Sequence, residues 1–170
     1  MDLSKIIRDI PNFPEPGILF RDITPILQDG EALVSSVDQM AEKMERTSYD
    51  IIAGPESRGF IFGVPLAYKL KKGFIPIRKK GKLPSETISK EYALEYGTAT
   101  IEMHKDAIKK GQRVFIVDDL LATGGTAKAM VEMIEEAGGI VAGFVFLIEL
   151  EALKGRDVLK GYTIESIIKY

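Results

Sequence analysis

Short apolar runs alternate with segments of helical periodicity along most of the chain. Apolar residues recur at helical spacing from Leu33 to Met44, from the turn PESRGF (55–60) towards Leu70, and from Ala127 to Ala137. This alternation predicts an α/β fold in which a mostly parallel, twisted sheet carries helices on both faces. The expected strands are YDIIAG (49–54), GFIPIRK (73–79), the half-exposed TATIEMH (98–104), the fully buried RVFIVDD (113–119) and IVAGFVFLIEL (140–150).

Local signals refine this outline near the N-terminus and inside one helix. The stretch LSKIIRDI (3–10) predicts a short first helix, and PNFPEPG (11–17) predicts a constrained loop because it holds three prolines and a glycine. Asp29 is a candidate N-cap for the helix that runs to Met44. Pro65 should either kink its helix or mark where that helix begins.

Residues 79–97, KKGKLPSETISKEYALEYG, show no clear periodicity. A loop of this length inside a compact domain is usually a lid, a binding loop or a disordered segment. The alternative is that ISKEYALEY (88–96) forms a short exposed helix without a function. Composition alone does not separate these two interpretations.

Composition excludes several classes of site. The formal net charge of -2 provides no global basic field for a large nucleic-acid surface. The chain has no cysteine, which excludes disulfides, thiolate metal sites and thiol catalysis and fits a reducing cytoplasm. The single histidine, His104, cannot build a histidine-rich metal site and is expected to be a surface strand residue. No stretch approaches the roughly 20 apolar residues of a membrane span, and the charged N-terminus lacks the apolar core of a signal peptide.

The string VFIVDDLLATGGT (114–126) has the features of a phosphate site. It follows a buried strand, and ligands of parallel sheets bind at the carboxyl ends of strands. Its small residues let backbone amides approach an anion, its threonines add hydroxyl donors, and a helix from about Thr126 contributes its positive end. The spacing matches neither the GxxxxGK loop nor GxGxxG. The expected cup for one phosphate comprises Ala122, Thr123, Gly124, Gly125 and Thr126.

Two acids stand directly before this cup. The carboxylates of Asp118 and Asp119 would repel a phosphate at close range, so they must face another part of the same ligand. Sugar hydroxyls donate to carboxylates, and a bound Mg²⁺ would also offset their charge. The plainer alternative is an aspartate pair that caps a loop, followed by an ordinary Gly-Gly turn. The complete thirteen-residue string favours a sugar phosphate over that alternative.

The same string resembles the phosphoribosyl-diphosphate (PRPP) binding motif of the type I phosphoribosyltransferases. Four further stretches resemble the adenine phosphoribosyltransferase family, so that the resemblance covers nearly the whole chain. They are FPEPGILFRDITP (13–25), GPESRGFIFG (54–63), RKKGKLPSETISKEYALEYG (78–97) and LIELEALKGRDVL (147–159).

The resemblance implies a fold and an activity. The fold would be the type I phosphoribosyltransferase fold over residues 1–170, with a small base-binding hood at about 1–30 and a mobile lid at about 79–97. The enzyme would transfer the 5-phosphoribosyl group from PRPP to adenine and release AMP and pyrophosphate, in the cytoplasm, as a homodimer. Mg²⁺ would be carried mainly by PRPP, with no direct protein ligand assigned, and neither nucleic acid nor membrane is an expected partner.

The resemblance also implies site residues. The cup would hold the 5-phosphate, and Asp118 and Asp119 would face the ribose hydroxyls. Lys80 stands where many relatives carry arginine, and a lysine cannot make the same bidentate contact. Glu95 would act on the purine proton and Tyr96 would close over the reacting atoms. Pyrophosphate would be bound by Ser57, Arg58, Arg78, Lys79 and Lys82, some of them across a dimer interface, and adenine by Leu19, Phe20 and Arg21.

Plainer roles exist for three of these residues. Arg58 could be a surface partner of Glu56, Phe20 a core aromatic, and Glu95 a solvated lid carboxylate. Two other functions also stay open. The acceptor could be hypoxanthine, guanine or xanthine, because the fold and the PRPP motif do not decide the base. The chain could instead be a PRPP-sensing regulator, although its domain begins almost at Met1 and it shows no basic recognition helix.

Overall fold

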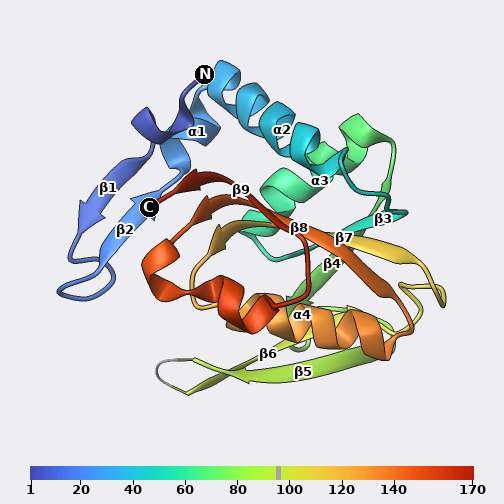
Figure 1. Ribbon diagram of the computed structural model, residues 1–170. Coiled ribbons are helices and arrows are strands. Elements are labelled where there is room, and N and C mark those ends of the chain that lie inside the picture. The colour runs from blue at the N-terminus through green and yellow to red at the C-terminus, as the bar shows by residue number, and fades with distance from the viewer. Residues whose placement is uncertain (95–96) are drawn as a thin grey trace. The chain divides into compact units, whose positions relative to one another are not determined.

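The computed structural model describes residues 1–94 and 97–170, which fold into two compact units (Figure 1). The first unit comprises Met1–Gln39 and the second Met40–Tyr170, and each is described by itself. The first unit extends further along the chain than the hood of about 1–30 that the resemblance implies. No helix of the described residues is long and apolar enough to cross a membrane.

The first unit begins with a 3-10 turn and a β-hairpin. After one 3-10 turn at Leu3–Lys5, strand β1 (Arg8–Pro11) pairs antiparallel with β2 (Leu19–Asp22). The prediction of a helix over residues 3–10 is therefore wrong. The reason is tertiary: the backbone of 8–11 finds its hydrogen-bond partners across the hairpin, where Arg8 also pairs with Asp22.

Two helices follow the hairpin. Helix α1 (Thr24–Gln28) is short, and α2 (Gly30–Met44) begins in the first unit and ends in the second. The carboxylate of Asp29 accepts hydrogen bonds from the backbone amides of Glu31 (2.9 Å) and Ala32 (3.1 Å). This satisfies amides that would otherwise lack a partner at the start of a helix and confirms Asp29 as the N-cap.

A seven-stranded sheet forms the second unit, in the order β5-β6-β4-β3-β7-β8-β9. The pairs from β4 through β3, β7 and β8 to β9 are all parallel, whereas β6 pairs antiparallel with both β4 and β5. This confirms the predicted α/β fold with a mostly parallel sheet. The strands are β3 (Ile51–Pro55), β4 (Gly73–Lys79), β5 (Thr87–Ala93), β6 (Thr98–His104), β7 (Arg113–Leu121), β8 (Ile140–Glu149) and β9 (Ile164–Lys169).

Helices α3 (Arg58–Leu70) and α4 (Gly125–Glu136) cover opposite faces of this sheet (Figure 1). The central strand β7 is buried on both faces: Val114 and Ile116 pack into the core beneath α4, while the alternate residue Phe115 points the other way. Pro65 lies inside α3 and does not mark its beginning, because the helix already starts at Arg58.

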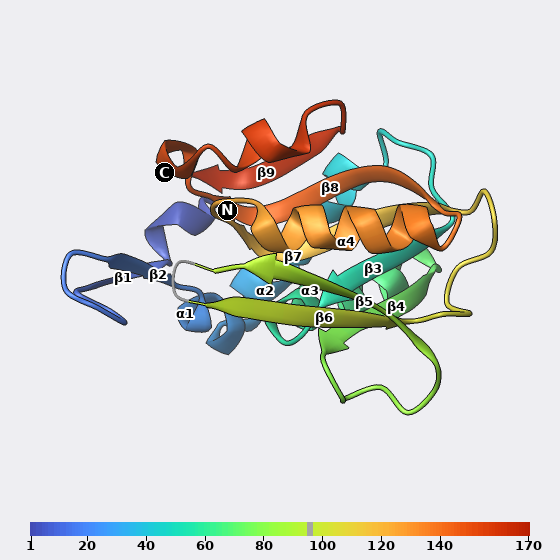
Figure 2. The same ribbon diagram turned by 90° about the horizontal axis from the view of Figure 1, so that it is seen from below.

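Strand β5 is the largest departure from the expected secondary structure. Residues 87–93 pair along their whole length with β6, so this part of the expected lid is neither a loop nor a helix (Figure 2). Ile88, Lys90 and Tyr92 are half-buried against α4, while Ser89, Glu91 and Ala93 are exposed. The two-residue period was hidden in the sequence because Lys90 occupies a half-buried position, where its ammonium pairs with Glu136 at 2.6 Å.

Candidate active site

Two cavities open at the carboxyl ends of β3, β4 and β7. The first has a volume of about 570 Å³ and the second about 380 Å³. The structure thus brings together three stretches that lie far apart in the sequence: 55–58, 77–80 and 118–126. The two cavities share five of their lining residues: Arg58, Tyr92, Asp118, Asp119 and Thr126.

The second cavity lies over the glycine-rich turn at residues 122–126, the candidate phosphate cup. Gly124 has a φ of +86°, and a Cβ added there would lie 2.7 Å from the backbone oxygen of Gly155. Only glycine combines this conformation with so close a neighbour. The cup therefore depends on the segment around Gly155, which follows β8 and backs the turn.

A partly buried ion pair holds that segment in place. Arg156 donates to both carboxylate oxygens of Glu149, at 2.6 and 2.8 Å, and also to the backbone oxygen of Ile164 at 3.0 Å. Ser166 donates a further hydrogen bond to Glu149 at 2.5 Å. The hydrogen bonds from Arg156 lower the pKa of Glu149, although its burial acts in the opposite direction. The short 3-10 helix Gly155–Leu159 is thereby tied to the ends of β8 and β9.

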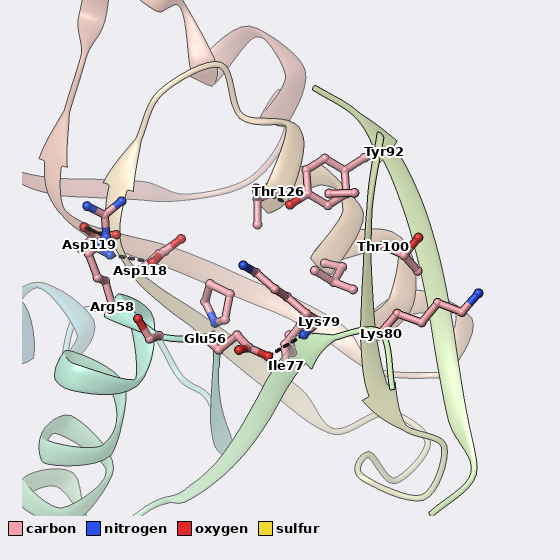
Figure 3. A pocket seen from close by; sticks show the side chains of 14 residues that line it. Glu56, Arg58, Ile77, Lys79, Lys80, Tyr92, Thr100, Asp118, Asp119 and Thr126 are labelled. Atoms are coloured by element: carbon pink, nitrogen blue, oxygen red, sulfur yellow. Dashed lines mark hydrogen bonds and ion pairs between the residues drawn. The ribbon is translucent and has the colours of Figure 1, made fainter. Parts of the chain in front are cut away.

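Asp118 and Asp119 stand at the end of β7, in front of the cup. The backbone amide of Asp119 donates to the Asp118 carboxylate at 2.8 Å, and the Asp119 carboxylate pairs with Arg58 Nε at 3.0 Å (Figure 3). Burial raises the pKa of Asp118 well above its ordinary value, and the charge of Asp119 adds to this effect. Burial also raises the pKa of Asp119, while the cation of Arg58 opposes the rise. Arg58 therefore contacts Asp119, and no ion pair between Arg58 and Glu56 is needed to explain its position.

The opposite wall of the first cavity carries lysines and Glu56. The carboxylate of Glu56 accepts from the backbone amide of Lys79 at 2.6 Å and lies 3.3 Å from Arg78 Nε. Figure 3 shows the Lys79 ammonium directed into the cavity, whereas the Lys80 side chain extends away from it. The peptide bond between Glu56 and Ser57 is cis. Of the consecutive cations on β4 and just beyond it, Lys79 is thus placed to meet an anion in this cavity.

Tyr92 is a cavity residue that the sequence did not reveal. Its hydroxyl lies 3.1 Å from Thr126 Oγ1, at the N-terminus of α4, and the two hydroxyls share a hydrogen bond (Figure 3). Thr100 on β6 lines the first cavity as well. Tyr92 was missed because residues 79–97 show no clear periodicity, and the signal available there was the alternation of Ile88, Lys90 and Tyr92. Thr100 lies on a strand that the sequence predicted, but no local pattern marked it as a cavity residue.

The site residues expected from the sequence divide into four groups. The structure brings together Ser57, Arg58, Lys79, Asp118, Asp119 and the cup of 122–126 around the two cavities. Arg78 and Lys82 are not among the described residues that line them. Leu19, Phe20 and Arg21 lie on β2 in the first unit, where Phe13 packs edge-on against Phe20 with ring centroids 5.2 Å apart. Glu95 and Tyr96 lie outside the described residues.

The carboxylates of this site offer oxygen ligands of the kind that Mg²⁺ prefers. Asp118 and Asp119 line both cavities, but the described residues contain no group of three or more histidine or acidic side chains that could hold a metal ion.

Comparisons with known proteins agree with this geometry. A family model described as the phosphoribosyl transferase domain matches residues 25–168. Adenine phosphoribosyltransferase of Lachnoclostridium phytofermentans is 63% identical over 168 residues, which cover 99% of this chain and 97% of that protein. The crystal structure of adenine phosphoribosyltransferase from Thermoanaerobacter pseudethanolicus has a TM-score of 0.96 at 55% identity and covers 99% of this chain and 98% of its own.

A second solved structure carries ligands. Adenine phosphoribosyltransferase from Saccharomyces cerevisiae, complexed with adenine and an imino-altritol bisphosphate, has a TM-score of 0.89 at 40% identity and covers 95% of this chain and 94% of its own. Because the family model spans most of the chain and the relatives match nearly all of it, the chain belongs to the adenine phosphoribosyltransferase family of phosphoribosyltransferases.

Proposed function

We propose that this protein transfers the 5-phosphoribosyl group of PRPP to N9 of adenine in purine salvage. The bond between C1 of the ribose and the pyrophosphate oxygen breaks, the bond between C1 and N9 forms, and N9 loses its proton. The products are AMP and pyrophosphate. Membership of the adenine phosphoribosyltransferase family supports this proposal, and the arrangement of the two cavities is compatible with it.

The observation that carries the proposal is that two anion sites flank one pair of carboxylates. The cup, at the positive end of α4, suits the 5-phosphate. Lys79 and Arg58 line the first cavity and suit the pyrophosphate. Asp118 and Asp119 line both cavities and would accept from the ribose hydroxyls between them. PRPP has this order of groups: phosphate, hydroxylated sugar and pyrophosphate.

The same arrangement suits the charges that develop in the reaction. As the bond to pyrophosphate lengthens, C1 takes on oxocarbenium character, as in other glycosyl transfers. The leaving pyrophosphate gains negative charge, which Lys79 and Arg58 would stabilise. Mg²⁺, if PRPP carries it into the site, would supply further positive charge to the leaving group.

We assign adenine recognition to β2 on the basis of the family resemblance. Phe20 would stack on the flat base, and the backbones of Leu19 and Arg21 would read its edge. The edge-on contact with Phe13 supports this assignment, because it holds the Phe20 ring from one side.

The substrate is tested by steady-state turnover with PRPP and one base at a time: adenine, hypoxanthine, guanine or xanthine. We expect AMP formation from adenine to exceed turnover of each oxopurine by at least about a hundredfold in kcat/KM, the discrimination typical of a site that hydrogen-bonds the base edge. Negligible adenine turnover beside a good oxopurine rate would overturn the substrate. Absence of turnover with every base, together with a gel shift on purine-operon DNA, would favour the PRPP-sensing regulator.

Glu95 is proposed to accept or orient the proton of the purine. We predict that Glu95→Gln keeps its affinity for PRPP and loses kcat by about a hundredfold or more, as expected for a general acid-base group. The measurement is kcat with adenine, beside a PRPP titration of the same variant. A kcat within about twofold of wild type, far below that range, would reduce Glu95 to a solvated lid carboxylate. Tyr96 is proposed to close over the reacting atoms and exclude water.

The oligomeric state and the cellular location stay predictions. A homodimer would give Arg78 and Lys82 a role, because residues of this region can act across the dimer interface in the family. Light scattering coupled to gel filtration measures the mass of the particle. A cytoplasmic location follows from the same family resemblance.

A further inference from the structure

Tyr92 bridges the two cavities. Its side chain lines both of them, and its hydroxyl lies 3.1 Å from Thr126 Oγ1 (Figure 3). The ring also covers the cup, because a Cβ added to Gly125 would lie 3.6 Å from Tyr92 Cδ2. A ligand phosphate in the cup would therefore lie close to this pair of hydroxyls.

Packing fixes where the Tyr92 hydroxyl points. Ile88 and Tyr92 pack against the apolar core that α4 shares with the sheet. Between them, Lys90 pairs with Glu136 of α4 at 2.6 Å. Because successive alternate residues of β5 contact the same helix, the strand presents Tyr92 to the beginning of α4 in a defined orientation.

The direction of the hydrogen bond between Tyr92 and Thr126 decides whether Thr126 can also donate to a phosphate. The Thr126 hydroxyl has one proton and two lone pairs, and the oxygens of a phosphate dianion accept but do not donate. If the Thr126 hydroxyl donates its hydrogen bond to Tyr92, it cannot also donate one to the phosphate. If Tyr92 donates to Thr126 Oγ1 instead, the Thr126 proton is free to point into the cup. The 3.1 Å separation suits either direction.

We propose that Tyr92 is a positioning residue for the 5-phosphate. Its hydroxyl donates to Thr126 Oγ1, and Thr126 in turn donates to a phosphate oxygen. Each hydrogen bond in such a chain polarises the next, so the Thr126 hydroxyl becomes a stronger donor and its orientation is fixed. The inference rests on the proposed function in that it takes a sugar 5-phosphate as the ligand of the cup.

The test compares Tyr92→Phe, Thr126→Val and the double variant by calorimetric titration with ribose 5-phosphate, which needs neither adenine nor catalysis. We expect Tyr92→Phe to raise the Kd by about threefold to tenfold, the usual value of one hydrogen bond. Thr126→Val should cost at least as much, and the double variant should bind no more weakly than Thr126→Val alone. In a Thr126→Ser background, which keeps the hydroxyl, Tyr92→Phe should again weaken binding.

Kinetics of the same proteins provide a second readout. Tyr92→Phe should raise the KM for PRPP by a similar factor and leave the KM for adenine within about twofold of wild type, since the hydrogen bond reaches only the phosphate. Tyr68→Phe is the matched control because Tyr68 lies on α3 with 88% of its surface exposed. It should change neither constant.

Two results would overturn the inference: a Kd for ribose 5-phosphate that Tyr92→Phe leaves within about twofold of wild type, or fully additive losses in the double variant. Additive losses together with a lower Tm would mean that the hydroxyl only fastens β5 to α4. Failure of the proposed function would look different. Wild type would then make no AMP, while the titrations would still report on the hydroxyl pair.

Discussion

Two regions next to the second cavity, the cup at 122–126 and the strand pair β5 and β6, differ in the contacts that hold them in place. The segment around Gly155 packs behind the cup at 122–126, and the partly buried ion pair of Glu149 and Arg156 holds that segment in place. The arm, defined as β5 and β6, forms the edge of the sheet, and half-exposed contacts such as Lys90 to Glu136 hold β5 to α4. The cup is thus specified by close packing, which tolerates no added atoms. Strand β5 of the arm instead combines the half-buried side chains of Ile88 and Tyr92 with a solvent-accessible ion pair.

This difference fits the task of each region. A phosphate must be held at one place for C1 to meet the base, and preorganised donors do this at no cost during the reaction. A covering strand has to let the substrate pass, so contacts of low free energy suit it. Variants in the two regions should therefore have effects of different size.

The largest effect is expected from Gly124→Ala. The added methyl would lie 2.5 Å from Val158 Cγ2 and 2.7 Å from the backbone oxygen of Gly155, so the turn or its backing must shift. A displaced cup should lower kcat/KM for PRPP by about a hundredfold or more, because a misplacement of about 1 Å can cost this much. Steady-state AMP formation measures the loss.

Gly161→Ala is the matched control for this variant. Gly161 has a φ of +94° and nothing within 4 Å of an added Cβ, so it shares the backbone cost of about 1–2 kcal/mol without the collision. Its kcat/KM for PRPP should stay within about twofold of wild type, because backbone strain at this turn does not displace the cup. Equal losses in both variants would contradict the packing argument.

Asp118→Asn should weaken function and strengthen the fold. Loss of a charged acceptor should raise the KM for PRPP by about tenfold to a hundredfold. Because the folded protein raises the pKa of Asp118, it binds this proton more tightly than the unfolded chain. The ionised carboxylate therefore costs stability as the pH rises from the ordinary value of 3.8 through the raised pKa.

The Tm of Asp118→Asn should accordingly exceed that of wild type near about pH 7, and the difference should shrink as the pH falls towards the ordinary value. Thermal unfolding across this range measures both trends. The exposed Asp106→Asn is the control and should show neither trend. A lower Tm for Asp118→Asn at every pH would show that the carboxylate supports the fold.

Arg156→Met tests the backing of the cup with an intermediate effect. The variant leaves Glu149 buried and unpaired, and because Arg156 is partly exposed we expect a loss of about 1–3 kcal/mol. This corresponds to a fall in Tm of roughly 2–12 °C for a chain of this size. The KM for PRPP should rise by about threefold to tenfold, while the KM for adenine stays unchanged.

Two comparisons sharpen this prediction. Adding Glu149→Gln to Arg156→Met should recover part of the stability, because the uncompensated charge is removed. Since hydrogen bonding lowers the pKa of Glu149, the stabilisation by this pair is present above the ordinary value of 4.5 and is lost as the pH falls through the lowered pKa. The gap in Tm between wild type and Arg156→Met should therefore narrow below that value. A gap independent of pH would exclude the ion pair as its cause.

The smallest effect is expected from Lys90→Gln in the arm. Its partner Glu136 is about half exposed, and solvent screens such pairs so that they contribute little to stability. The Tm should fall by no more than about 4 °C, and kcat/KM for PRPP should stay within about threefold of wild type. The exposed Lys109→Gln is the matched control. A loss as large as that of Gly124→Ala would remove the distinction between the two regions.

The sequence predicted the interior of the fold well and its edges poorly. The strands at 73–79 and 98–104 were predicted to the residue, because apolar periodicity reports burial directly. Residues 8–10 of the helix expected at 3–10 belong to a strand, and so do residues 87–93 of the segment expected as a loop or a short helix. Each belongs to an antiparallel pair whose partner lies further along the chain, and no local pattern names that partner.

By itself, the sequence determined the family, the α/β fold and the order of groups at 114–126, because glycines, adjacent acids and an apolar strand are local properties of the chain. Only the tertiary structure decided that Lys79 rather than Lys80 points into the cavity, that Gly155 backs the cup, and that Tyr92 reaches Thr126. These contacts join strands and turns that are distant in sequence. They depend on the register and packing of the sheet, which a linear pattern does not specify.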